Sequence, residues 1–483
     1  MLVRPASSTV AHCMPAQFPL LNKYFRHASL LATRHLAGLC ERVQLERAAV
    51  SALLICSLHA ASVYGQDPAA VSGDWPNFYT NSQAELLLDQ GRAALREDDH
   101  DTAVRLIADA LQIIRINHGL RSPLQIEPLQ LLIAAQLQGR NWQAADDQID
   151  YFRWLNARNY RLDFGAYLSG SEALSDLLLT ASADPQNPLA VRYLISAKNQ
   201  NWRTISAIEA RRGKQSPMLI PWLYRVVQNH YQQSALIRRR GLTSYDFHSD
   251  ADALVNGFRL SRNTSLDMSY NIGQELLERI AALAPADAEA RALVAVHQAD
   301  WELIYGQHDA ALARYQLARQ WMREGGRSAA EIEEFFNRPV IIPEQQLQLT
   351  WPADATSRAM TMLAWSPLYP GVQSPLAAAN AAPETGQLLA RLRLIPPRQS
   401  IVTDSAESLT APWRLEVDTA NPDQEAFREL IRRQAMLLQF RPLQSETQQW
   451  YSLTMQLSPH FIADESLTEM LGLNTDDVTT TEQ

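Results

Sequence analysis

The feature that most constrains the fold is a long succession of helical patterns, from about Asn81 to Asn337. Apolar residues recur there at the three- and four-residue spacing of amphipathic helices, and the two-residue alternation of strands is scarce. A helix with one apolar stripe buries that stripe only by packing against other elements. Because the breaks between the patterns are short, we predict that consecutive helices fold back on one another and stack as pairs.

Four helix pairs are predicted from these patterns. They are Ala84–Arg96 with Asp101–Ile116, Leu124–Gln138 with Asn141–Asn156, Ala190–Lys198 with Trp202–Arg211, and Ala288–Tyr305 with Asp309–Arg323. A further long helix is predicted within Ser216–Arg240, whereas the rest of Leu162–Asn271 has a less regular pattern. The dipeptides Asn141-Trp142 and Asn201-Trp202 each stand between the two helices of a predicted pair. This recurrence indicates internal repetition.

Small residues in the first and last pairs follow the pattern of a repeat family. The positions are Leu87, Gly91, Ala103, Ile107, Ala110 and Leu111 in the first pair, and Ala299, Gly306, Ala311, Tyr315 and Ala318 in the last. Small side chains let two helices approach closely, and a glycine permits a tight connection. By these residues the region resembles tetratricopeptide repeats, which implies an α-solenoid. The sequence departs from the family at Glu302, where an aromatic is preferred, and we expect Trp301 to supply that packing.

The N-terminal region has the three parts of a secretory signal. Residues 48–63 are apolar, follow Arg42 and Arg47, and lead into Val63-Tyr64-Gly65. A helix of this length spans about 24 Å, short of the roughly 30 Å hydrocarbon core of a bilayer. We therefore predict a signal that is cleaved before Gln66 and a periplasmic location. The alternative is an inner-membrane protein anchored by residues 48–63.

The same region contains every cysteine of the chain, Cys13, Cys40 and Cys56. The mature protein is therefore expected to have no disulfide, no thiolate metal site and no cysteine nucleophile. Because signal peptides rarely begin so far upstream, we expect translation to start near Val43 or Leu45. Residues 1–65 are thus interpreted as an upstream extension and a signal peptide.

Composition places the chain among globular proteins and argues against nucleic acid as a ligand. Hydrophobic residues make up 46% and charged residues 20% of the sequence, so enough apolar surface is available for a core. The net charge is −9, and residues 66–483 hold 37 basic against 50 acidic residues. Nucleic-acid binding depends on cationic neutralisation of phosphates, which an acidic chain of this kind supplies poorly.

The character of the sequence changes after residue 337. Seven prolines fall within 338–384, so this stretch is predicted to be a Pro/Ala-rich linker or an irregular wrapping segment. Strand alternation follows in Leu388–Ile395, Trp413–Asp418 and Tyr451–Leu457, and Gln424–Phe440 has a helical pattern. We predict a small α+β domain of order β-β-α-β over 385–460. Residues 461–483 form an acidic polar tail.

Several residues of this domain match a known family. They are Val417, Ala420, Pro422, Phe427, Ala435-Met436 and Phe440-Arg441-Pro442. By these residues the domain resembles the C-terminal domain of TonB-type proteins, which binds outer-membrane transporters partly by strand addition. The resemblance implies a candidate edge strand made of Tyr451, Ser452, Leu453, Thr454, Met455, Gln456 and Leu457. The chain lacks the family's uncleaved anchor and long proline-rich spacer, and an unrelated α+β domain is the alternative.

Motifs that carry catalysis or bind a cofactor or metal are not found in the sequence. There is no glycine-rich phosphate loop and no His-Glu-x-x-His, and the stretch around Ser171 lacks the glycines of a nucleophile elbow. The acidic run 97–101 is interpreted as a solvated turn in which Asp101 caps the following helix. We therefore predict no catalytic, cofactor-binding or metal-binding residues, and a protein that is not an enzyme.

The sequence as a whole predicts a mainly α protein, with a helical-repeat region over 66–337 and a C-terminal binding module. Its expected function is that of an exported scaffold in the bacterial cell envelope, for protein or peptide partners that include outer-membrane or other envelope proteins. A TonB-related transducer or adaptor is the first alternative. An envelope enzyme whose site assembles from distant residues is the second.

Overall fold

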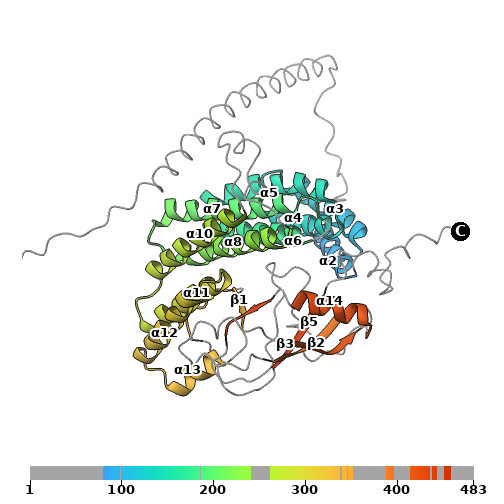
Figure 1. Cartoon of the computed structure of the whole chain (residues 1–483). Coiled ribbons are helices and arrows are strands. Elements are labelled where there is room, and N and C mark those ends of the chain that lie inside the picture. The colour runs from blue at the N-terminus through green and yellow to red at the C-terminus, as the bar shows by residue number, and fades with distance from the viewer. Residues whose placement is uncertain are drawn as a thin grey trace, which may run out of the picture. The chain divides into compact units, whose positions relative to one another are not determined.

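The structure is a computed structural model of the chain (Figure 1). It describes residues 80–97, 99–184, 187–240, 262–337, 340–344, 346–351, 388–395, 414–421, 423–435, 438–442 and 451–457. All of these residues belong to one compact unit, Tyr79–Gln483. The predicted signal, the tail 461–483 and the predicted linker beyond residue 351 lie outside the described residues. Within the described part of the chain, no helix has the length and apolar character needed to cross a membrane.

Helices make up most of the described structure. They are α2 (Asn81–Arg96), α3 (His100–His118), α4 (Ile126–Gln138), α5 (Trp142–Leu162), α6 (Phe164–Ala183), α7 (Ala190–Arg212), α8 (Ile220–Arg240), α10 (Arg262–Leu283), α11 (Ala288–Ile304), α12 (His308–Glu324) and α13 (Ala329–Phe336), with short 3-10 helices at Pro123–Gln125 and Pro217–Leu219. Helices that follow one another in the chain pack side by side, for example α2 on α3, α6 on α7 and α11 on α12 (Figure 1). The predicted mainly helical class is therefore confirmed.

The third predicted pair is wrong, because Ala190–Arg212 is a single helix. Asn201 lies in its middle, fully buried, and its Nδ2 donates to Oδ1 of Asn229 on α8 at 2.8 Å. Asn141, by contrast, is the N-cap of α5 and accepts from the backbone N–H of Ala144. The two Asn-Trp dipeptides therefore have different roles. The second one does not mark a boundary, because the side-chain N–H of Asn201 has its partner on a packed neighbouring helix instead of in a helix cap.

The turn before α3 also differs from the prediction. The N-cap is Asp99, whose Oδ1 accepts from the backbone N–H of Thr102 at 3.1 Å, and Asp101 lies within the first turn of the helix. This hydrogen bond lowers the pKa of Asp99, because it favours the charged carboxylate. The helix thus starts two residues earlier than the acidic run suggested.

The C-terminal region forms a small sheet with one helix. Its elements are β2 (Leu388–Ile395), β3 (Arg414–Asn421), α14 (Glu425–Ala435) and β5 (Tyr451–Leu457), together with the short strands β1 (Ile341–Ile342) and β4 (Gln439–Phe440). The three longer strands are antiparallel in the order β3-β2-β5, so the predicted edge strand β5 has one neighbour among the described strands. The predicted helix does not continue to Phe440, since Gln439 and Phe440 pair with β1. A proline at 442 also disfavours helix at the residue before it.

One face of this sheet is buried under α14. Ala390 and Leu392 of β2 are buried, and Phe427 and Ile431 of α14 pack into the same core with no exposure. The strand register shifts between Arg391 and Leu392, a bulge that places Leu392 opposite Val417. Alternating side chains therefore keep their apolar members on the face that α14 covers, as the sequence pattern predicted.

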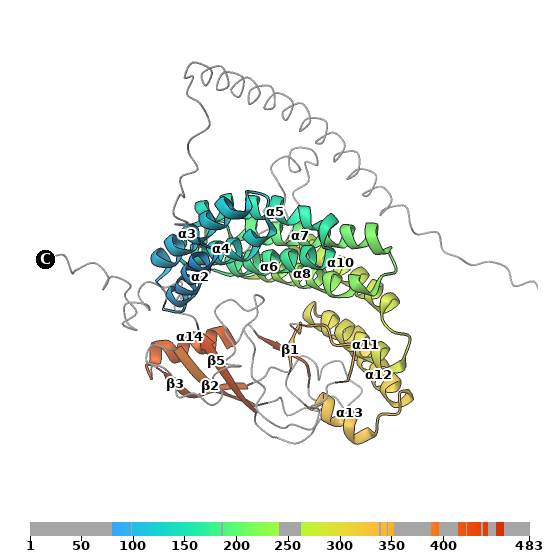
Figure 2. The same cartoon turned by 180° about the vertical axis from the view of Figure 1, so that it is seen from behind.

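The helical region and the C-terminal sheet share one hydrophobic core. Tyr224 of α8, Trp301 of α11, Ile341 of β1 and Leu392 of β2 belong to one continuous cluster of buried side chains. Strand β1 contacts α11, and the two lie side by side in both views (Figure 1, Figure 2). The described residues 340–344 and 346–351, near the start of the predicted linker, therefore pack against the helices.

Trp301 fills the interface between α10 and α11. Its indole Nε1 donates to the backbone oxygen of Tyr270 at 3.0 Å, and its ring occupies the space above Gly273, where an added Cβ would lie 2.0 Å from the ring. The neighbouring Glu302 is buried and accepts from the Tyr270 hydroxyl at 2.5 Å. Trp301 thus packs between helix pairs, and the lack of a side chain at Gly273 permits that close approach.

Candidate functional site

Helix α11 contains charged side chains at positions that solvent does not reach. All residues from Ala292 to Glu302 are buried, so this stretch is enclosed on every side. Asp300 is 2% exposed and His297 5%. A buried charge is costly unless it is paired and hydrogen-bonded. The hydrogen-bond partners of these buried side chains therefore show which other helices and segments must pack against α11.

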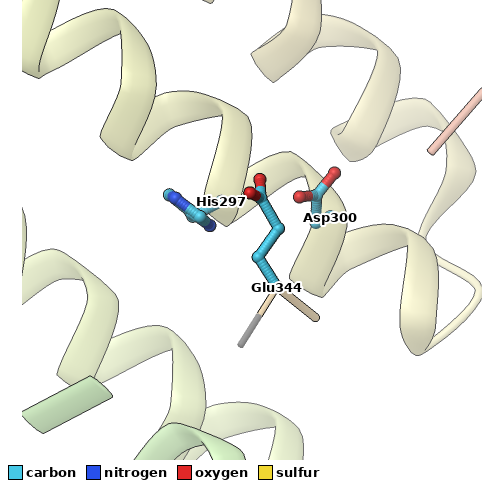
Figure 3. Close-up of side chains that lie close together, drawn as sticks. All are labelled: His297, Asp300 and Glu344. Atoms are coloured by element: carbon cyan, nitrogen blue, oxygen red, sulfur yellow. The ribbon is translucent and has the colours of Figure 1, made fainter. Parts of the chain in front are cut away.

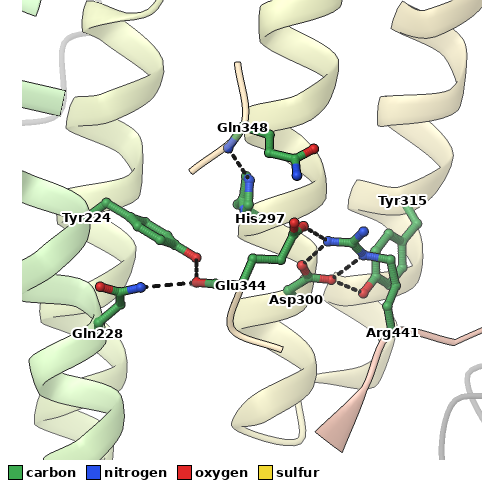
Figure 4. Close-up of polar contacts among 8 residues, drawn as sticks. All are labelled: Tyr224, Gln228, His297, Asp300, Tyr315, Glu344, Gln348 and Arg441. Carbon is green, nitrogen blue, oxygen red and sulfur yellow. Dashed lines mark hydrogen bonds and ion pairs between the residues drawn. The ribbon is translucent and has the colours of Figure 1, made fainter. Parts of the chain in front are cut away.

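Asp300 is paired with an arginine from the far end of the chain. Arg441 donates from Nε to Oδ1 of Asp300 at 3.0 Å and from Nη2 to Oδ2 at 2.5 Å, which is a two-pronged contact (Figure 4). Nη2 also donates to Oε1 of Glu344 at 2.5 Å. Burial opposes the charge of Arg441, but the carboxylates of Asp300 and Glu344 outweigh it and raise the pKa of Arg441 well above its ordinary value. The guanidinium therefore remains charged in a site that is 2% exposed.

Helix α12 contributes a hydroxyl to the same carboxylate. Tyr315 donates to Oδ1 of Asp300 at 2.6 Å. Burial and the carboxylate of Asp300 raise the pKa of Tyr315 well above its ordinary value, so the phenol keeps the proton that it donates. Asp300 thus accepts from two side chains that come from different elements (Figure 4).

The segment after β1 is fixed through its backbone. The carbonyl oxygen of Glu344 accepts from the Tyr224 hydroxyl at 2.8 Å and from Nε2 of Gln228 at 3.1 Å, both on α8. The backbone N–H of Gln348 donates to Nε2 of His297 at 3.2 Å. Because that nitrogen accepts, the imidazole is neutral with its proton on Nδ1, and burial lowers the pKa of His297 accordingly.

The same side chains form a candidate metal site. One atom each of His297, Asp300 and Glu344 lies within 4.8 Å of the others, and the three side chains converge (Figure 3). Arg441, however, already bonds both oxygens of Asp300 and one of Glu344, and Gln348 bonds Nε2 of His297. A metal would have to displace the arginine, so the donor set fits an internal ion clamp better than a metal centre. We call Asp300, Glu344 and Arg441 the ion clamp.

Strand pairing brings Arg441 to this position. Ile341 pairs with Phe440, and the backbone N–H of Arg441 donates to the oxygen of Val340 at 2.8 Å. The guanidinium also lies over the ring of Phe335 on α13, 5.7 Å from its centre. The ion clamp therefore joins α11 and α13 to the two segments that carry β1 and β4.

A second feature is an exposed apolar surface on α3, α5 and the turn between α3 and α4. We call it the Trp154 surface, and its residues are Ile116, Leu120, Leu124, Tyr151, Trp154, Arg158 and Leu162. Trp154 is 46% exposed and Leu162 75%. Tyr151 stacks on Trp154 with ring centres 5.7 Å apart, and the guanidinium of Arg158 lies 5.7 Å from the Trp154 ring centre. The Tyr151 hydroxyl donates to the oxygen of Leu120 at 2.8 Å, which fixes the turn against α5.

A third feature is a buried polar layer between α7 and α8. Nζ of Lys198 donates to Oε1 of Gln233 at 3.1 Å, and burial lowers the pKa of Lys198 to about 8. His230 is 5% exposed, and burial together with the charge of Lys198 lowers its pKa to about 3. Nδ1 of His230 has no hydrogen-bond partner among the residues that the structure describes, which agrees with a neutral ring.

Sequence reasoning found few of these residues. Arg441 was noticed as part of Phe440-Arg441-Pro442, but its partners Asp300 and Glu344 were not singled out. The sequence did contain one signal for this site. Asp300 is a charged residue within a helix whose residues are mostly apolar, and a buried charge of this kind requires a partner. The predicted partner-binding strand Tyr451–Leu457 lies at a sheet edge, and its side chains fall outside those described.

Comparison with known proteins does not extend this assignment. No protein-family model matches the sequence, and no curated protein matches it either. Function is therefore argued from the geometry of these sites.

Proposed function

We propose that this protein is an exported interaction scaffold of the cell envelope. A tetratricopeptide-like array of helix pairs presents its binding surface. The array also holds a C-terminal module that resembles the C-terminal domain of TonB-type proteins. The consecutive packing of α2 through α12 supports the array, since each helix contacts the next along the chain. Signal-like residues 48–63 support the export.

The observation that carries the proposal is the Trp154 surface. Exposed apolar groups that gather in one place mark interaction sites in proteins, and tryptophan, tyrosine and arginine dominate the binding energy of such sites. Here Trp154 and Tyr151 are stacked, Arg158 covers one ring, and Leu120 is 63% exposed beside them. Because hydrogen bonds and stacking already fix these side chains, binding would cost little ordering of the surface.

The ion clamp supports the scaffold in a different way. It ties the C-terminal module to α11 through a buried pair, and the Tyr224 and Gln228 bonds fix the intervening segment. A module held in this manner presents the edge of β5 in a fixed position relative to the helices. Rigid presentation suits a protein that brings two partners together.

Affinity capture from the envelope of the source cells tests the proposal. The full chain would be compared with a variant carrying Trp154→Ala and Arg158→Ala, and with an Arg105→Ala control at an exposed position of α3. We expect the double variant to lose a specific partner at least tenfold while the control retains it. Recovery of the same partners in the same amounts by all three chains would contradict the proposed function.

A second candidate is a TonB-related adaptor that contacts outer-membrane receptors. The observation that favours it is the edge position of β5 in a sheet with the order strand, strand, helix, strand. A photo-cross-linking residue at Thr454 is expected to capture an outer-membrane receptor if strand addition occurs there. Retention of the chain in the inner membrane by residues 48–63 would favour the transducer form, and a freely periplasmic chain would argue against it.

A further inference from the structure

The polar layer between α7 and α8 contains buried atoms that have no hydrogen-bond partner. Residues 228–234 of α8 are all buried and, apart from Tyr231, all have polar side chains. Among the residues that the structure describes, nothing bonds Nδ1 of His230 or Oδ1 of Asn201. The two side chains are 5% and 0% exposed. Because buried polar atoms are nearly always bonded in native proteins, these two atoms mark a place where a polar group fits.

Two hydrogen bonds between the helices place both atoms beside Lys198. Nζ of Lys198 donates to Oε1 of Gln233 at 3.1 Å, and Nδ2 of Asn201 donates to Oδ1 of Asn229 at 2.8 Å. Lys198 and Asn201 lie three residues apart on α7 and are therefore neighbours on its surface. His230 lies on α8 between the two bonded partners, and the charge of Lys198 is one cause of its lowered pKa. The amine, the imidazole and the amide therefore converge.

Lys198 has the chemistry of a reactive amine. Its partner Gln233 is uncharged, and no carboxylate among the described residues bonds Nζ. Burial therefore acts on the ammonium without an opposing charge and lowers the pKa of Lys198 to about 8. At pH 7 about one such amine in ten is unprotonated, compared with fewer than about one in a thousand for an ordinary lysine. An unprotonated amine has the free electron pair that a nucleophile needs.

The scarcity of lysine in this chain gives the residue at position 198 further weight. Of the 43 basic residues, only Lys23, Lys198 and Lys214 are lysines. Arginine, which supplies every other basic position, stays charged in proteins. Lysine is thus the basic side chain that this layer can hold in an uncharged form.

We propose that Lys198 is a covalent attachment site for a small aldehyde, which forms an imine with Nζ between His230 and Asn201. The electron pair of the amine forms a bond to the carbonyl carbon, and the carbonyl oxygen takes one of the two amine protons. The hydroxyl of this carbinolamine donates to Nδ1 of His230. It then leaves with the second amine proton as water, and a C=N bond remains. This chemistry goes beyond the scaffold function, which needs no reactive amine.

The surroundings of Lys198 favour this product. The imine nitrogen is a weaker base than the amine, so it replaces a charge that burial disfavours by an uncharged group. The aldehyde is small because Lys198 is only partly exposed and the side chains around its amine are buried. The unbonded Oδ1 of Asn201 provides an acceptor for a hydroxyl group on the aldehyde.

Reductive alkylation of the full chain with acetaldehyde and sodium cyanoborohydride tests the assignment. The reduction converts each imine into a stable N-ethyl lysine, and peptide mass spectrometry gives the rate at each position. Lys214, exposed directly after α7, provides the comparison within the same molecule. At pH 7 we expect Lys198 to react at least about tenfold faster than Lys214. A smaller ratio would overturn the inference.

Matched variants distinguish an assembled site from an isolated amine. His230→Gln removes the acceptor of the carbinolamine hydroxyl and should slow ethylation of Lys198 several-fold, relative to Lys214. His118→Gln, at the exposed end of α3, should leave that ratio unchanged. An unchanged ratio in His230→Gln would contradict the proposed site.

The pH profile of the unaltered chain decides the question if His230→Gln does not fold. The rate at Lys198 should level off above about pH 8, where the amine is already unprotonated, while the rate at Lys214 continues to rise toward about pH 10. Parallel profiles at the two lysines would overturn the inference.

Discussion

Replacement of Arg441 by methionine tests whether the ion clamp stabilises the fold as its geometry indicates. Arg441→Met retains an unbranched apolar stem and removes the three contacts to Asp300 and Glu344. Asp300 is 2% exposed, so its carboxylate would be left without a cation in a site that water does not reach. The hydroxyl of Tyr315 would remain as its side-chain donor.

The expected loss of stability is large for one substitution. Removal of one partner from a buried ion pair costs about 3–5 kcal/mol, mainly because the other charge stays buried and unpaired. Arg441 also lies over the Phe335 ring, a contact worth about 0.5–2 kcal/mol. With a denaturant slope of about 3 kcal/mol per M for a unit of this size, the urea midpoint should fall by roughly 1 M or more.

Urea unfolding followed by far-UV circular dichroism measures this effect. The half-exposed Arg432 of α14, paired with Glu425 and Glu429, provides a matched control, and Arg432→Met should cost less than about 1 kcal/mol. Adding Asp300→Asn to Arg441→Met neutralises the orphaned charge and should recover at least about 1.5 kcal/mol, which a double-mutant cycle reports as coupling. A cost below about 1 kcal/mol for Arg441→Met, or the absence of coupling to Asp300, would refute the reasoning.

Three further predictions concern other buried positions. Gly273→Ala would place a Cβ 2.0 Å from the Trp301 ring and should destabilise the protein by about 1–3 kcal/mol in thermal unfolding; an unchanged melting temperature would show that α10 and α11 can separate freely. The pKa of His230 is lowered to about 3, so its contribution to stability is complete above about pH 6.5 and is lost as the pH falls toward 3. The free energy of unfolding should therefore drop by roughly 2 kcal/mol between pH 7 and pH 5 from this residue, and a His230→Gln variant with the same pH slope would contradict this assignment. Burial also lowers the pKa of Lys198 to about 8. The ammonium group is therefore less stable in the folded protein than in the unfolded chain, where it is fully hydrated. Lys198→Met should thus raise the urea midpoint at pH 7, by an amount that corresponds to about 1–2 kcal/mol, and a lower midpoint would indicate that the Gln233 contact dominates.

Local sequence patterns predicted those strands and helices whose apolar residues all lie on one face of the element. The alternation in Leu388–Ile395 and Tyr451–Leu457 predicted the bounds of β2 and β5 as observed, because alternation follows the two-residue pleat of a strand. Helix α7 was divided in the prediction, since Asn201 and Trp202 are typical of a helix boundary when seen without their neighbours. The Nδ2 of Asn201 donates to Asn229 on another helix, and a contact of that kind has no local signature in the sequence.

The pairing of Asp300 with Arg441 in the ion clamp could not be predicted from the sequence, because it too depends on contacts between distant parts of the chain. Asp300 and Arg441 are 141 residues apart, and many arginines could have been the partner of that carboxylate. The pairing depends on the two-residue bridge between β1 and β4, which is too short to give an alternating pattern. The burial of Asp300 could be foreseen from the apolar residues around it on α11, but the identity of its cation could not.

The order in which the clamp residues leave the ribosome has a consequence for quality control. Asp300 is synthesised roughly 7–30 s before Arg441, at typical rates of 5–20 residues per second, and Glu344 also precedes the arginine, by 97 residues. Helix α11 therefore cannot close around its carboxylate until nearly the whole chain has emerged. A prematurely terminated product would retain an open, protease-sensitive end to its helical region, so only the complete polypeptide is expected to persist.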